Sequence, residues 1–163
     1  MTSGRRSSKA VTLSLFVWVM GAFLAVGPAY AQKFTRSHAT IQVSGTASAL
    51  KTGLGEAVDF SGPLRMSATV ITDPVRPPIV YVTIDGRGVK GIGNKTGKVY
   101  LNECEASVHR RFKGTNVIRT TFAFFENGPQ SYLRSKTGLL TLNLDFDRTT
   151  KVLTKATGSV GTL

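Results

Sequence analysis

The chain has 163 residues, and its 21 lysines and arginines outnumber nine acids to give a formal net charge of +12 at neutral pH. Its single cysteine excludes an internal disulfide framework. The sequence contains no G-x-S-x-G, H-E-x-x-H or C-x-x-C motif, which are typical of serine hydrolases, zinc enzymes and thiol oxidoreductases. We therefore expect a binding protein rather than an enzyme, with no catalytic residues, no metal site and no cofactor.

The first 31 residues follow the order of segments found in a secretory signal. Three cations, at positions 5, 6 and 9, precede an apolar run over residues 11–26, and the small-x-small sequence AYA occupies positions 29–31. The sixteen residues of that run are fewer than the roughly 20 needed to span a bilayer. We predict that residues 1–31 are a cleaved signal peptide, that no transmembrane anchor remains after processing, and that the protein is periplasmic or secreted.

The predicted mature chain, residues 32–163, is strongly basic. It keeps 18 lysines and arginines and all nine acids, so its formal net charge is +9. Its 132 residues suffice for a single domain with a buried core. An excess of positive charge attracts polyanions, and for an exported protein these are acidic polysaccharides, envelope lipids and nucleic acid.

Apolar and polar residues alternate along most of residues 32–163. LLTLNLDFD, residues 139–147, has leucine or phenylalanine at every even position from 140 to 146, and LRMSATVITD, residues 64–73, has the same period. Turn-forming sequences such as those at 73–78 and 127–129 separate such runs. We predict an all-β, mainly antiparallel fold, a single sandwich or barrel of about seven or eight strands, preceded by a loose lead-in over residues 32–39.

The stretch YLNECEASVHRRF, residues 100–112, gathers the cysteine, two acids and a histidine. As a strand it would bury Cys104 and expose Glu105 and His109 on the opposite face. As a short helix around 103–113 it would place Glu105 and His109 one turn apart, where they could pair or bind a metal. The β pattern on either side favours the strand, and in both forms we interpret the stretch as structural.

A glycine-rich segment follows the strand-like sequence PIVYVTID. Gly86, Gly88 and Gly91 have the G-x-G-x-x-G spacing of dinucleotide-binding loops, but no helical sequence follows them. One interpretation is a surface loop or hairpin tip whose glycines adopt positive φ. The other is an anion-binding loop, because residues 87–98 contain four cations and no acid, namely Arg87, Lys90, Lys95 and Lys98.

A second basic cluster lies at Arg110, Arg111 and Lys113. Arg119 would join it if residues 99–112 and 117–126 formed a hairpin. The two clusters predict ligand-binding residues of an exported, non-catalytic module for an anionic envelope or extracellular ligand. The alternative is a structural or assembly subunit that pairs with another protein through a sheet edge.

An enzyme ranks third among these hypotheses. It would require a cleft that holds two or more of five side chains that the sequence places apart, namely Glu103, Glu105, His109, Asp145 and Asp147.

Overall fold

The computed structural model describes residues 31–163. The predicted signal peptide therefore lies outside the described residues, apart from Ala31. Strands dominate the described chain, and the helical elements are one turn each. The elements are β1 (Lys33–Ala47), α1 (Ala49–Thr52), β2 (Val58–Thr72), β3 (Ile79–Asp85), β4 (Lys90–Gly93), β5 (Val99–Asn102), β6 (Glu105–Arg111), β7 (Thr115–Glu126), η1 (Ser131–Arg134), β8 (Lys136–Phe146) and β9 (Leu153–Gly161).

The nine strands form one continuous sheet in the order β1-β9-β8-β7-β5-β4-β2-β3-β6, and β1 also pairs with β2. This confirms the prediction of an all-β, mainly antiparallel fold. The exception to the antiparallel pattern is the β1–β9 pairing, which is parallel. There are nine strands rather than seven or eight because short interruptions divide β3 from β4 and β5 from β6.

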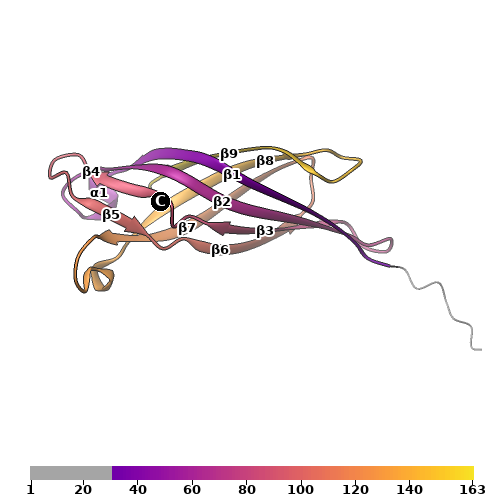
Figure 1. Ribbon diagram of the computed structural model, residues 1–163, viewed down its shortest axis with the longest axis horizontal. Coiled ribbons are helices and arrows are strands. Elements are labelled where there is room, and N and C mark those ends of the chain that lie inside the picture. The colour runs from indigo at the N-terminus through magenta and orange to yellow at the C-terminus, as the bar shows by residue number, and fades with distance from the viewer. Residues whose placement is uncertain (1–30) are drawn as a thin grey trace, which may run out of the picture.

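The sheet is closed at one end of the molecule and splits into two layers toward the other. At the closed end β4 and β5 connect β2 to β7, and β1 meets β9 at two residue pairs. Beyond that point β1, β2, β3 and β6 form one layer, and β7, β8 and β9 form the other. Figure 1 shows this elongated shape, with α1, β4 and β5 at the closed end and the start of β1 at the opposite end. We call that opposite end the turn end.

The alternating sequences supply the core, as predicted. Leu140, Leu142, Leu144 and Phe146 of β8 are all buried, and so are the even-numbered residues from 64 to 70 in β2. Aromatic rings fill the barrel near its closed end. The ring of Phe60 lies 5.4 Å from that of Phe122 and 4.9 Å from that of Phe124, both in edge-on geometry that favours aromatic pairs.

The prediction of a loose lead-in over residues 32–39 is wrong from Lys33 onward. Those residues form the first half of β1 and pair in register with β2, from Lys33 opposite Thr72 to Ala39 opposite Met66. A second contact joins this segment to the other layer, because the Ser37 hydroxyl accepts a hydrogen bond of 3.0 Å from the Leu153 amide. The small side chains of the segment gave a weak hydrophobic pattern, although its backbone is fully paired with β2.

The stretch 100–112 is β-structure and not a helix. Tyr100–Asn102 belong to β5 and Glu105–Arg111 to β6. Cys104 is 3% exposed, whereas Glu105 and His109 are exposed. The burial pattern is the one expected for the strand interpretation, with the titratable side chains on the solvent face.

Candidate functional site

Three turns and the first residues of β1 meet at the turn end. The β2–β3 and β6–β7 turns are joined by a hydrogen bond of 2.8 Å from the Phe112 amide to the Pro78 carbonyl. The β6–β7 and β8–β9 turns are joined by the rings of Phe112 and Phe146, whose centroids lie 5.6 Å apart. Since Lys33 pairs with Thr72 at the end of β2, residues far apart in sequence form one surface.

This surface is basic. Six of its seven cations are exposed and Lys151 is half-buried, and none of the seven forms an ion pair with an acid in residues 31–163. The ammonium of Lys151 also lies 4.7 Å from the centroid of the Phe112 ring. We call these seven residues the basic end: Lys33, Arg76, Arg110, Arg111, Lys113, Arg148 and Lys151.

The two acids in these turns bind backbone amides rather than cations. Asp73 accepts a hydrogen bond of 2.8 Å from the Val75 amide, and Asp147 accepts bonds of 2.9 and 2.6 Å from the amides of Thr149 and Thr150. These hydrogen bonds lower the pKa of both carboxyls. The acids therefore hold the turns in shape and form no ion pair with the cations of the described chain. Two of those cations donate to carbonyls nearby, Arg110 to His109 and Lys151 to Arg148.

The basic end contains three of the eight predicted ligand-binding residues, Arg110, Arg111 and Lys113. Arg119 does not join them. It points outward from the middle of β7, opposite Thr141 of β8. The expected hairpin between 99–112 and 117–126 is limited to β5, because β6 pairs with β3 while β7 pairs with β8.

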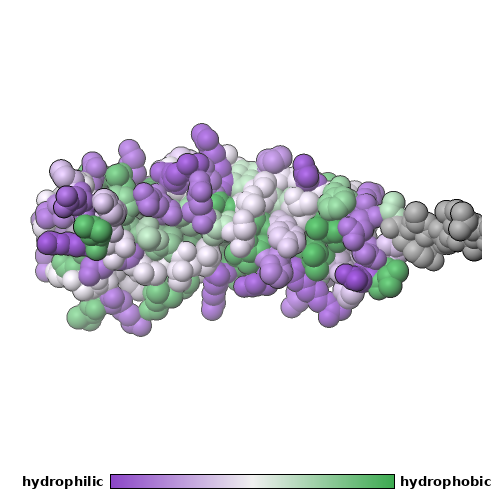
Figure 2. All heavy atoms as spheres, turned by 90° about the horizontal axis from the view of Figure 1, so that it is seen from below, coloured by the Kyte–Doolittle hydropathy of each residue, from purple (hydrophilic) through white to green (hydrophobic). Residues whose placement is uncertain are grey.

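Figure 2 shows a mixed surface from below, with purple hydrophilic atoms and green hydrophobic ones side by side toward the end where β1 begins. Phe34 and Val75 are among the exposed large apolar residues of the chain. Both belong to segments of the turn end. The basic end is thus a charged surface with apolar residues beside it.

Arg87 and Lys90, from the first predicted cluster, lie away from the basic end. Arg87 donates two hydrogen bonds of 2.9 Å to Asp85 and lies 3.2 Å from a Glu105 carboxylate oxygen. Those acids neutralise its charge. Lys90 is exposed at the start of β4.

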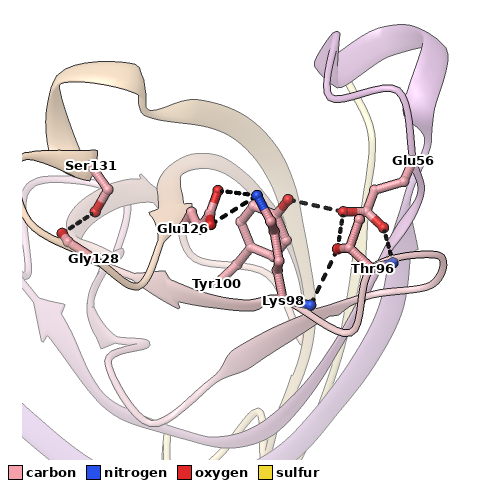
Figure 3. A network of polar contacts seen from close by, with 7 residues as sticks. All are labelled: Glu56, Thr96, Lys98, Tyr100, Glu126, Gly128 and Ser131. Atoms are coloured by element: carbon pink, nitrogen blue, oxygen red, sulfur yellow. Dashed lines mark hydrogen bonds and ion pairs between the residues drawn. The ribbon is translucent and has the colours of Figure 1, made fainter.

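Lys95 and Lys98 lie at the closed end, where the β4–β5 turn binds a carboxylate of the same chain. Glu56 accepts backbone hydrogen bonds of 3.0 Å from Lys95 and 2.9 Å from Thr96, and a bond of 2.6 Å from the Thr96 hydroxyl. Figure 3 shows the Tyr100 hydroxyl directed at the same carboxylate and Lys98 paired with Glu126. The turn at 94–98 has the donors of an anion-binding loop, and Glu56 occupies them.

The three glycines of the G-x-G-x-x-G segment are required for close packing and not for positive φ. That part of the prediction is wrong, since among the glycines of residues 86–98 only Gly97 has a positive φ, at 67°. A Cβ on Gly88 would lie 2.6 Å from the Pro63 carbonyl oxygen, and one on Gly91 would lie 2.6 Å from the Val58 side chain. Gly88 and Gly91 therefore allow close contact with β2 and the residues beside it, whereas a Cβ on Gly86 would lie 2.9 Å from the Cβ of Cys104.

Cys104 is a core residue, and burial raises the pKa of its thiol. Because the thiolate is the reactive species, we expect the native protein to react with a thiol reagent more than about tenfold slower than the protein in denaturant. Absorbance of released thionitrobenzoate measures both rates. Equal rates, or a disulfide-linked dimer on a non-reducing gel, would contradict the buried position.

Within residues 31–163 no cluster of three or more His, Cys, Asp and Glu side chains is arranged to hold a metal ion. Among the described helices none is both long and apolar enough to cross a membrane. No protein-family model, curated protein or solved structure matches this chain. The functional conclusion therefore depends on the geometry of the surfaces themselves.

Proposed function

We propose that the protein is an exported, non-catalytic binding module that captures an anionic ligand at its basic end. One observation supports this most directly: seven cations from four segments converge on one end, while the two acids among them are bound to backbone amides. Turns on a rigid β scaffold are common positions for binding residues. The clustering also sets this surface apart from cations scattered over the sheet faces.

The ligand must offer several negative charges, because isolated surface ion pairs contribute little. A single exposed pair is worth at most about 1 kcal/mol, whereas a polyanion that meets several cations releases many counterions at once. Acidic polysaccharide, anionic lipid and nucleic acid all meet this requirement. The salt dependence of binding reports how many contacts are made.

A charge-removal variant of the basic end tests the proposal. The variant Arg111→Ser/Lys113→Ser/Arg148→Ser should bind polyanions at least about tenfold more weakly at low salt. For single-stranded DNA, the slope of log K against log salt concentration should become shallower by about 2. Affinities for single-stranded DNA, alginate, dextran sulfate and phosphatidylglycerol vesicles are measured at about 0.02 and 0.15 M salt.

The matched control removes three cations away from the basic end: Lys51→Ser/Lys90→Ser/Arg134→Ser. It has the same net charge as the test variant, so it should keep most of the affinity. If both variants lose affinity equally, binding depends on net charge alone and the proposed site is wrong. Circular dichroism of both variants checks that the fold is intact.

An open sheet edge favours the alternative function, a structural or assembly subunit that pairs with another protein. Within residues 31–163 the backbone contact from the β5–β6 segment to β7 ends at the 3.2 Å hydrogen bond from the Glu103 amide to Ala123, and β6 pairs with β3 alone. A partner strand could add to this edge. Concentration-dependent oligomers that persist at high salt would support assembly over anion binding.

A further inference from the structure

The outer face of the β1-β2-β3-β6 layer carries its side chains in straight rows that cross the strands. The register aligns His38 with Ser67, Ser67 with Thr83, and Thr83 with Ser107. Successive strands are about 4.8 Å apart, so the row presents a hydrogen-bonding side chain at each step. These residues were not among the candidate binding residues that the sequence indicated.

Rows of mostly longer side chains border this row on both sides. One neighbouring row contains Arg65, Asp85 and Glu105, and the other contains Arg36, Thr69, Tyr81 and His109. Short side chains between two rows of longer ones leave a trough across the layer. The trough has a volume of about 480 Å³ and is lined by His38, Arg65, Ser67, Thr83, Asp85 and Glu105, among others.

The floor of the trough offers free donors and acceptors. The hydroxyls of Ser67 and Thr83 lie 2.5 Å apart and share one hydrogen bond, which leaves the other lone pairs open to a ligand. In the part of the chain that the structure describes, the Ser107 hydroxyl and the His38 imidazole donate to no protein group. A ligand rich in hydroxyl groups could satisfy all four side chains.

The row of Arg65, Asp85 and Glu105 forms a charged wall that carries both positive and negative charges. Arg87 bridges Asp85 and Glu105, at 2.9 and 3.2 Å, and a smaller hollow of about 320 Å³ continues the trough past Arg65 and Arg87. Asp85 accepts three hydrogen bonds from Arg87, which lower its pKa to about 2, and a carboxylate has about four lone-pair sites. Such paired planar groups bind neighbouring hydroxyls without requiring a charged ligand.

The row on the side opposite the charged wall lies just beyond the residues that line the trough, and over β3 and β6 it is aromatic. The rings of Tyr81 and His109 stack with centroids 5.5 Å apart and planes 26° from parallel, and Tyr81 is 43% exposed. A flat amphipathic ring beside a row of polar groups provides the apolar contact that the C–H face of a sugar ring needs.

We infer that this trough is a glycan-binding site, in which an oligosaccharide lies across the four strands with its hydroxyls on the Ser67–Thr83–Ser107 row. The inference is independent of the proposed function, because the trough and the basic end involve different residues. The balance of charge along the wall favours a polyhydroxyl chain over a polyanion or a peptide of one sign.

The test uses the exported protein and a set of hexasaccharides: maltohexaose, cellohexaose, chitohexaose and an alginate hexamer. Isothermal titration calorimetry should detect at least one with a Kd of about 1 mM or tighter. Thr83→Tyr fills the floor of the trough and should weaken that binding at least about tenfold. Thr121→Tyr, the same substitution on the exposed face of β7, should leave it unchanged.

Three outcomes would overturn the inference: no binding of any hexamer at millimolar concentration, an equal loss in Thr83→Tyr and Thr121→Tyr, or binding of the alginate hexamer alone that disappears with salt. The last result would assign the sugar acid to the basic end. Dextran sulfate is titrated in parallel, since Thr83→Tyr should not change its affinity. This separates failure of the trough from failure of the proposed function.

Discussion

Substitution of Gly45 by alanine is expected to lower the free energy of unfolding by about 3 kcal/mol or more. Gly45 pairs with Val160 in the parallel contact that joins β1 to β9. A Cβ at this position would lie 1.9 Å from the Val160 carbonyl oxygen, and the φ of +155° is one that side chains rarely adopt. The added methyl group therefore meets backbone, and the strands must separate to accommodate it.

Urea unfolding followed by circular dichroism measures this effect, and Gly161 provides the control. A Cβ on Gly161 meets no atom within 4 Å, so Gly161→Ala at the end of β9 should change stability by less than about 0.5 kcal/mol. If Gly45→Ala were as stable as Gly161→Ala, the close β1–β9 contact that shuts the sheet would be refuted.

The β fold could be predicted because its strongest signals are local. Successive residues of β8 point alternately to the core and to the outside. Leucines at alternate positions, such as Leu140 and Leu142, therefore indicate the strand without any knowledge of its partners. The first half of β1 lacks that signal, since Thr35, Ser37 and Ala39 face inward with small side chains. That half is specified by its pairing with β2, from Lys33 opposite Thr72 to Ala39 opposite Met66, a contact that no single-sequence pattern reveals.

The basic end could be predicted only in part, because it is assembled by topology. Arg111 and Lys113 lie close together in sequence and form a visible cluster, but Arg76 and Arg148 lie in other turns. The β2–β3 turn is recognisable from Asp73 and Pro74, the β6–β7 turn from Gly114, and the β8–β9 turn from Asp147. The order of the strands in the sheet decides which turns lie at the same end. The alternation of apolar and polar residues does not reveal that order. The trough is not predictable from the sequence for the same reason, since its row depends on the register of four strands.

Nothing in the sequence indicates the role of Glu56, because it is a lone acid with no motif around it. Glu56 accepts hydrogen bonds from the turn that surrounds it. The Thr96 hydroxyl donates from the β4–β5 turn, and the Tyr100 hydroxyl donates from β5. The cations of that turn had suggested an external anion. In the structure the backbone amides of this turn already donate to Glu56. Removing that acceptor charge should therefore have a large effect on stability.

Glu56→Gln is expected to lower the Tm at pH 7 by roughly 5–10 °C. Glu56 is 4% exposed, and its carboxylate accepts hydrogen bonds from two amides and two hydroxyls. A glutamine brings an NH₂ group to donors that need an acceptor, so buried donors lose their partners. Glu126→Gln is the control. It removes an exposed 3.0 Å pair with Lys98 and should shift the Tm by less than about 2 °C.

The pH dependence of the Tm difference between wild type and Glu56→Gln identifies the cause of that difference. Hydrogen bonds from Thr96 and then Lys95 lower the pKa of Glu56 to about 2, from an ordinary value of 4.5. A lowered pKa means that ionised Glu56 stabilises the fold above pH 4.5, and that this stabilisation is lost as the pH falls toward 2. The Tm difference between wild type and Glu56→Gln should therefore narrow between pH 4.5 and 2, while other acids titrate equally in both proteins. A difference that stays constant through that range would show that glutamine disturbs packing rather than charge.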